Sequence, residues 1–131
     1  TKKAADIYNL LGECYYNKES YKKSEEYFLK ALSIQNTNTQ VLCNLGVLNW
    51  MQGKNKEAVN FFQQALKINP DHKDSLANLV IVNYNEKNIA SCINYAERFL
   101  EKYPNDEEIC FYLQNSLAQV QNNEPGITKA L

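Results

Sequence analysis

An interval of 34 residues recurs through most of this chain, and it limits the fold more than any other feature of the sequence. Two leucine positions repeat at that interval in three successive segments: Leu11, Leu45 and Leu79, then Leu32, Leu66 and Leu100. The segments span residues 5–38, 39–72 and 73–106. Self-similarity at a fixed period of this length is the mark of an array of repeated supersecondary units. We therefore treat each segment as one structural unit.

Each unit has the pattern of two helices. Its apolar residues recur with a period near 3.6, as they do on one face of a helix. In the second unit "QGKN" (52–55) breaks the pattern, and Gly53 is the residue there that most easily adopts a positive φ. Pro70 ends the second helix, and acidic Asp71 and Asp74 suit the start of the next one.

Small residues mark the place where the two helices of a unit approach each other. In the second unit we expect Gly46 on the first helix to face Ala58 and Ala65 on the second. Leu45 and Phe62 then fill the space on either side. Such alternation of small and large side chains is how close-packed helix crossings are built.

The third unit exchanges these sizes. Ala96 stands at the position of Phe62, and Phe99 at that of Ala65. The total volume is roughly kept, which is the core change that proteins tolerate best. Val80 replaces the glycine, so we expect the two helices of this unit to lie further apart.

The order Leu-Gly, Tyr, break, small residue, aromatic, "Ala-Leu" and Pro resembles the tetratricopeptide repeat. The resemblance covers 5–106, most strongly in "NLLGECYY…YFLKALSI" and "NLGVLNW…EAVNFFQQALKINP" and more loosely in "SLANLVIVNY" and "RFLEKYPND". It implies an all-α fold, a right-handed superhelical solenoid of antiparallel helix pairs. The first helix of each pair would line the concave side.

The end of the chain allows two interpretations. In residues 107–121 one helical face carries Ile109, Cys110, Leu113, Leu117 and Val120. This segment is either the capping helix that an array needs to close its end or the first helix of a fourth repeat. Residues 122–131 are then a tail or a truncated helix.

Charge and composition disfavour several classes of function. The net charge is −1, with both signs interspersed, so the basic footprint typical of nucleic-acid binding is absent from the sequence. No run approaches the roughly 20 apolar residues that span a membrane. The start "TKKAADIYNL" lacks a secretory signal, and because it also lacks a Met we expect a piece of a longer protein.

The sequence predicts neither an enzyme nor a cofactor or metal site. The four cysteines, Cys14, Cys43, Cys92 and Cys110, include no C-x-x-C spacing. The one histidine, His72, lies in "NPDHKD" and reads as a solvated turn residue. No glycine-rich phosphate loop and no nucleophile–base pair is visible in the sequence. Reduced thiols fit a cytoplasmic location.

The resemblance also implies which residues face a peptide groove. They are Asn9, Glu13, Tyr16 and Asn17 in the first unit, Asn44, Val47, Trp50 and Met51 in the second, Asn78, Ile81, Tyr84 and Asn85 in the third, and Tyr112 in the last helix.

Two subsets of these positions have competing interpretations. Asn44 and Asn78 share one register, and their amides either bind the backbone of an extended peptide or are simply common there. Tyr16, Trp50 and Tyr84 form an aromatic stripe, which either anchors a ligand or packs between neighbouring helices.

Chaperone-binding members of this family clamp a C-terminal carboxylate with basic and amide residues. The matching positions here hold Asn9, Glu13, Asn44, Asp74 and Asn78, of which Asn44 alone agrees. Glu13 and Asp74 would repel a carboxylate, and no predicted groove residue is Lys or Arg. We therefore do not expect a chaperone-tail clamp.

The sequence favours a non-catalytic protein-protein interaction module, a scaffold or adaptor that binds a partner's peptide in its groove. One alternative is an appendage of a larger enzyme, such as a glycosyltransferase. Another is self-assembly through uncapped repeat ends, because residues 1–4 supply no strong polar cap before Ile7 and Leu10.

Overall fold

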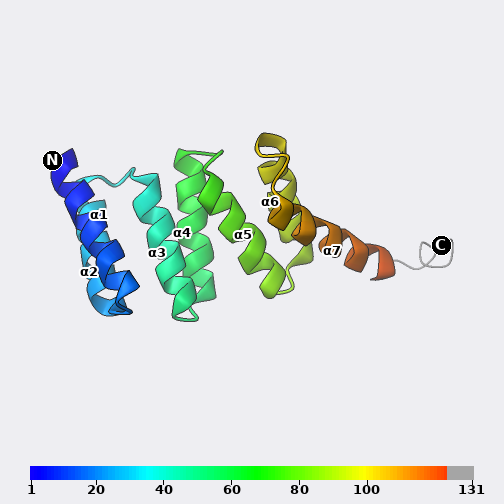
Figure 1. Cartoon of the computed structure of the whole chain (residues 1–131), viewed down its shortest axis with the longest axis horizontal. Helices are drawn as coiled ribbons and strands as arrows, with labels where there is room; N and C mark the ends of the chain where they lie inside the picture. Colours follow the sequence, from blue (N-terminus) through cyan, green and yellow to red (C-terminus); the bar gives the residue numbers. More distant parts are fainter. Residues whose placement is uncertain (124–131) are drawn as a thin grey trace. The chain divides into compact units, whose positions relative to one another are not determined.

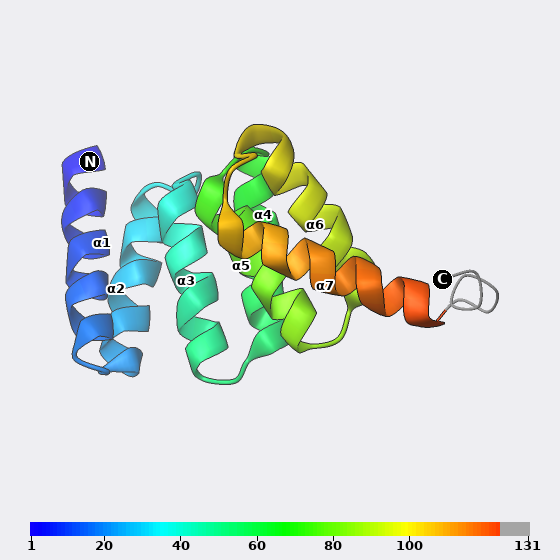
Figure 2. The same ribbon diagram turned by 45° about the vertical axis from the view of Figure 1, so that its right-hand side comes forward.

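The computed structural model describes residues 1–123 and is all-α over that range. Its helices are α1 (Lys2–Asn17), α2 (Tyr21–Ile34), α3 (Thr39–Met51), α4 (Asn55–Ile68), α5 (Lys73–Asn85), α6 (Ile89–Lys102) and α7 (Glu107–Asn123). Figures 1 and 2 show short turns joining helices that pack side by side in pairs, as α1 with α2 and α3 with α4. The all-α class and the paired helices predicted from the sequence are confirmed.

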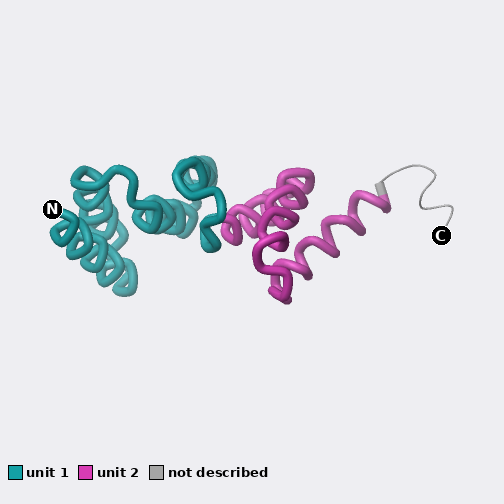
Figure 3. The backbone as a smooth tube through the Cα atoms, turned by 90° about the horizontal axis from the view of Figure 1, so that it is seen from above, with its two compact units in different colours: residues 1–75 teal, residues 76–131 magenta. Residues whose placement is uncertain are grey.

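The chain forms two compact units, residues 1–75 and residues 76–131 (Figure 3). The first holds α1 to α4, and the second holds α6, α7 and most of α5. Helix α7 runs to Asn123, two residues past the predicted end at 121. The rest of the segment expected to be a tail or truncated helix, 124–131, lies outside the described residues.

The turn inside each helix pair is built around one left-handed residue, and these residues are also 34 apart. They are Glu19 (φ 60°), Gly53 (φ 78°) and Lys87 (φ 64°). The following N–H then reaches back to close the first helix, as when Lys54 N–H donates to the Asn49 carbonyl at 2.9 Å. Gly53 was predicted from the sequence, whereas Glu19 and Lys87 hold the same conformation without glycine's freedom.

The residue before each later first helix caps that helix with its side chain, again at the 34-residue interval. The capping bonds are Val41 N–H to Asn38 Oδ1 (3.2 Å), Ser75 N–H to His72 Nδ1 (3.3 Å) and Ile109 N–H to Asp106 Oδ1 (3.0 Å). Each satisfies a backbone donor that a helix start leaves without a partner.

His72 is therefore not the solvated turn residue that the sequence predicted. It is half-buried, and Nδ1 also lies 2.8 Å from Ser75 Oγ. Burial lowers the pKa of the imidazole, and the nearby Asp74 carboxylate partly opposes that effect. The neutral ring suits the role because a protonated Nδ1 could not accept these hydrogen bonds.

The helix crossings of the first unit place an aromatic ring directly against a glycine. A Cβ atom added to Gly12 would overlap the ring of Phe28, and one added to Gly46 would overlap that of Phe62. We expected the Phe62 ring beside this crossing, but the structure places it at the crossing itself. Ser24 adds a 2.7 Å hydrogen bond from its Oγ to the Gly12 carbonyl.

In the second unit the residues at the corresponding positions differ but are equally buried. Val80, Ala96 and Cys92 have no exposed surface, and Phe99 is 1% exposed. Cys92 Sγ lies 3.3 Å from Ser116 Oγ on α7. Burial raises the pKa of this thiol, and the Ser116 contact partly offsets the rise. The position that holds Ser24 in the first repeat therefore holds a neutral thiol here.

Helix α7 buries a different face from the one predicted. Ile109 and Ser116 are buried, whereas Leu117 is 44% exposed. The expectation that Leu117 shares the buried face with Ile109 was wrong. Residues 109 and 116 are seven positions apart, which is two helical turns, so they share one face of α7.

Candidate functional site

A pocket of about 220 Å³ lies between α1 and α3 in the first unit. Its lining residues are Glu13, Tyr16 and Asn17 on α1, Phe28 on α2, and Asn44 and Val47 on α3. Five of these six were predicted groove residues, and Phe28 was not. The pocket follows from the fold, because the 34-residue interval brings equivalent turns of α1 and α3 together.

Asn44 organises the polar side of this pocket. Its Nδ2 donates to Asn9 Oδ1 at 3.0 Å and to Glu13 Oε1 at 3.2 Å. Its Oδ1 accepts from Gln40 Nε2 at 3.0 Å. Both N–H donors of the amide are therefore engaged within the protein, so Asn44 cannot donate to a peptide backbone without breaking one of these bonds. Its structural role is to hold Asn9 and Glu13 in place.

The aromatic side of the pocket continues the core. Tyr16 is half-buried, packs against the hydrophobic cluster that contains Phe28, and lies 5.8 Å from Tyr21 between ring centroids. Burial raises the pKa of Tyr16, and Tyr21 raises it further. Tyr16 thus meets both descriptions given for the aromatic stripe, since it packs on the core and also lines a hollow.

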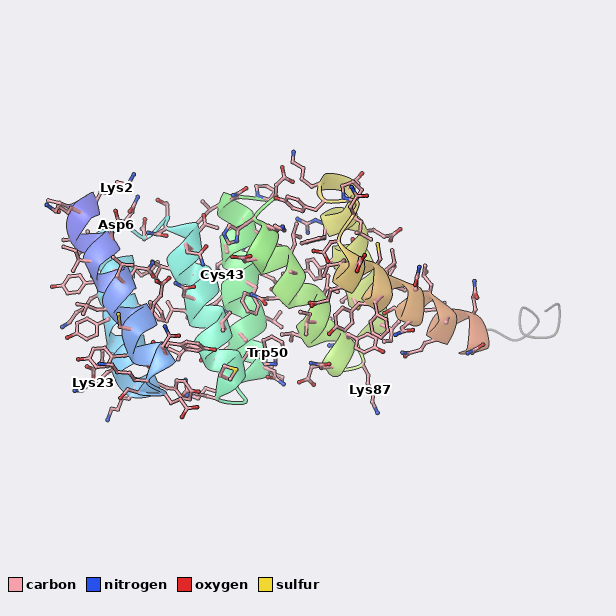
Figure 4. The ribbon with its side chains drawn as sticks, viewed as in Figure 1. Lys2, Asp6, Lys23, Cys43, Trp50 and Lys87 are labelled. Carbon is pink, nitrogen blue, oxygen red and sulfur yellow. The ribbon has the colours of Figure 1, made fainter. Side chains whose placement is uncertain are left out.

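Trp50 and Met51 lie at the end of α3, and neither lines this pocket. Trp50 is half-buried (labelled in Figure 4), whereas Met51 is 55% exposed. Neither residue approaches the Asn44 network, so the predicted groove of the first unit divides into an organised pocket and a more exposed apolar end.

The opposite side of the first helix pair carries a layer that sequence reasoning missed. Tyr15 and Tyr27 stack with ring centroids 5.4 Å apart and planes 3° apart, and Tyr8 lies 6.1 Å from Tyr27. Three lysines lie over these rings: Lys18 5.8 Å and Lys23 5.4 Å from Tyr15, and Lys30 5.2 Å from Tyr27. Figure 4 labels Lys23. The seven-residue spacing of Tyr8 and Tyr15 was the available signal, because it places both on one helix face.

This tyrosine–lysine layer changes the expectation of an end without a polar cap. Ammonium groups over tyrosine faces gain cation–π attraction while lysine stems cover the rings. The apolar residues that stay open on α1 are Ile7, 49% exposed, and Leu10, 58% exposed.

The second unit has its own hollow, of about 530 Å³, whose chemistry differs from that of the first. It is lined by Tyr84, Asn85, Lys87, Ile89 and Gln119. Tyr84 meets Tyr112 edge to face, with 4.9 Å between ring centroids. The pKa of Tyr112 is raised by burial, and then by Glu108, Tyr84 and Cys92. A lysine, labelled in Figure 4, stands at this hollow, where the first unit's pocket has a glutamate.

Two predicted residues on α5 do not line that hollow. Asn78 and Ile81 are half-buried, and Asn78 has interactions of its own. The structure thus brings together Tyr84, Asn85 and Tyr112 in one place and leaves Asn78 and Ile81 outside it.

Other kinds of site were searched for in residues 1–123. No group of three His, Cys, Asp or Glu side chains in that range could hold a metal ion. None of the helices described is long and apolar enough to cross a membrane. All four cysteines are free thiols: Cys14 is exposed, Cys110 is half-buried, and Cys43 and Cys92 are buried.

Several solved structures share this fold. The first tetratricopeptide repeat domain of Spaghetti (RPAP3), bound to the HSP90 peptide SRMEEVD, superposes with a TM-score of 0.85 and 16% identity, over 92% of this chain and 95% of that one. The Sgt2 domain from Aspergillus fumigatus gives 0.79 and 17%, over 88% and 78%. The Arabidopsis OM64 domain gives 0.83 and 11%, over 90% and 98%.

Sequence comparison gives the family. No curated protein gave a significant match to this chain. Two family models described as tetratricopeptide repeat match it, one over residues 3–71 and the other over residues 49–120. The matched ranges contain all the repeat positions described above. The chain belongs to the tetratricopeptide repeat family.

Proposed function

We propose that this chain is a non-catalytic adaptor that binds a peptide segment of a protein partner along its first helices. Tetratricopeptide repeat domains are generally protein–protein interaction modules. The observation that carries the proposal is the pocket between α1 and α3, where a fixed amide network meets an aromatic wall. The free thiols support a cytoplasmic location.

The partner segment is proposed to be neutral or basic. The pocket's lining includes Glu13 and contains neither Lys nor Arg. The Spaghetti domain holds an acidic HSP90 peptide, but a likeness at 16% identity concerns the fold and leaves this chain's ligand open. Our expectation that a C-terminal carboxylate is not the ligand rests on Glu13 alone in this pocket, so the peptide SRMEEVD belongs among the probes.

The test is selection of displayed peptides against this domain, followed by calorimetric titration of the selected sequences. Trp50→Ala, and Asn44→Ala combined with Asn78→Ala, are each expected to weaken binding about tenfold, since buried aromatic and polar anchors dominate such interfaces. Asn60→Ala, at an exposed position of α4, is the matched control. Unchanged affinity in both variants, or tighter binding of SRMEEVD than of any selected basic peptide, would contradict the proposal.

Self-association is a second candidate, favoured by one observation. Ile7 and Leu10 lie three residues apart on α1 and are about half exposed. Contiguous exposed apolar surface of this kind marks interaction sites. Sedimentation over a wide concentration range tests it: association that Leu10→Lys abolishes would support it, and a monomer throughout would remove it.

A further inference from the structure

We propose that the pocket between α1 and α3 takes one cationic side chain, lysine or arginine, of the partner segment. Glu13 would bind the charge, while Tyr16 and the apolar wall would take the aliphatic stem. This inference rests on the proposed function and names the residue type that the partner must present.

The carboxylate of Glu13 is fixed but not neutralised. It is half-buried, and its Oε1 accepts one hydrogen bond from Asn44 Nδ2 at 3.2 Å. Gln40 in turn holds Asn44 from the other side at 3.0 Å. No lysine or arginine lines the pocket. A carboxylate in this setting has lone pairs left for a charge-assisted hydrogen bond, which is about twice as strong as a neutral one.

The nearest basic residue in the sequence is committed elsewhere. Lys18 follows Asn17 directly, yet its Nζ lies over the ring of Tyr15 on the other side of the hairpin, 5.8 Å from the centroid. The helix turns between positions 15 and 16, so Tyr15 serves the tyrosine–lysine layer and Tyr16 serves the pocket. Glu13 therefore lacks a cation from its own helix end.

The size and walls of the pocket fit a side chain. Its volume of about 220 Å³ is smaller than the roughly 300–1,000 Å³ of pockets that enclose whole small-molecule ligands. Val47 and the Phe28 ring supply apolar surface, and Phe28 is held in place because it packs over Gly12. Lysine and arginine place methylene stems on such surface while the charged end meets a polar group. Tyr16 adds a ring face for a cation.

Other side chains would fit less well. A carboxylate would meet the like charge of Glu13 without a compensating cation. A purely apolar side chain would shield Glu13 from water and leave its charge unpaired, which is costly. A cation is the side chain that satisfies both the carboxylate and the aromatic wall.

The test uses isotope-labelled protein and small probes, so that no partner is needed. Nα-acetyl-lysine methylamide is titrated to millimolar concentration, with the isosteric norleucine compound as the uncharged control. We expect the lysine probe to shift the Asn44 side-chain amide and the Val47 signals, and the norleucine probe to bind at least fivefold more weakly. Glu13→Gln keeps the hydrogen bond from Asn44, and it should weaken the lysine probe about tenfold by removing the charge.

Matched controls make the outcomes decisive. Glu26→Gln removes an exposed carboxylate from α2 and should leave the titration unchanged. Equal binding of both probes, an unaffected Glu13→Gln variant, or no shift at the pocket would each overturn the cation pocket. Recovery of tight-binding displayed peptides without a basic residue would overturn it too, yet would leave the proposed function standing. Failure to recover any peptide would instead count against the proposed function.

Discussion

The second and third repeats share one backbone plan and fill it with different residues. At the helix crossing the second repeat has Gly46 and Phe62, where the third has Val80 and Ala96. At the turn the left-handed residue is Gly53 in one and Lys87 in the other. At the helix cap Asn38 is matched by His72. The comparison teaches that the 34-residue interval conserves geometry, and that each position accepts any chemistry that satisfies that geometry.

The largest effect is expected at the crossing. Gly46→Val alone drives a side chain into the Phe62 ring, and we expect a loss of about 3 kcal/mol or more in the free energy of unfolding. Phe62→Ala alone leaves a cavity and should cost a similar amount, about 3–5 kcal/mol. The double variant copies the third repeat, so its loss should be smaller than the sum of the two. Urea unfolding of all four proteins measures this coupling, and strict additivity would show that the two repeats do not use equivalent packing.

The next effect is expected at the turn. Lys87→Gly should stabilise the protein by up to about 1 kcal/mol, because a non-glycine residue at φ 64° carries a steric cost that glycine avoids. Gly53→Lys, which copies the third repeat in the second, should destabilise by a similar amount. Thermal unfolding of both variants checks the pair. Opposite signs are required, and a loss in both would mean that the lysine side chain itself contributes at residue 87.

The smallest effect is expected at the cap, and it depends on pH. The pKa of His72 is lowered in the folded protein, so the unfolded chain binds more protons as the pH falls. The capped state is therefore fully stable above the ordinary histidine pKa and loses stability as the pH drops through that value toward the lowered one. His72→Asn, which copies the second repeat, should remove this contribution.

Urea unfolding at about pH 7.5 and about pH 5.5 measures the response, which brackets the usual histidine range. The chain has one histidine, so the difference between the parent and His72→Asn isolates it from carboxylate titration. An identical pH response in the two proteins would show that His72 does not cap α5 in solution.

Sequence reasoning reached the architecture because its signals are local or periodic. Gly53 and Pro70 punctuate the helices by their own stereochemistry, and the leucine register gave the pairing. Lys87 could not be found in this way, because a left-handed lysine has no intrinsic signal. Only its place 34 residues after Gly53 marked it. His72 was missed for a related reason, since its role depends on Ser75 and not on the residue type.

The candidate site was predicted in its membership but not in its chemistry. Register placed Glu13 and Asn44 on one face, which the pocket bears out. The assignment of Asn44 as a peptide clamp failed to foresee its bonds to Glu13 and Asn9, which are 31 and 35 residues away. Such tertiary pairing depends on side-chain directions that periodicity does not supply. The tyrosine–lysine layer depends on rotamers of three lysines and was out of reach for the same reason.

The most direct test of peptide binding is chemical-shift mapping of a selected peptide on the isotope-labelled domain. The account predicts that within the first unit the largest changes fall on Glu13, Asn44 and Val47, on the pocket side of the first hairpin. The tyrosine–lysine layer offers a competing surface on the same helices. Shifts concentrated on Tyr15 and Tyr27, with the Asn44 amide unmoved, would contradict the account.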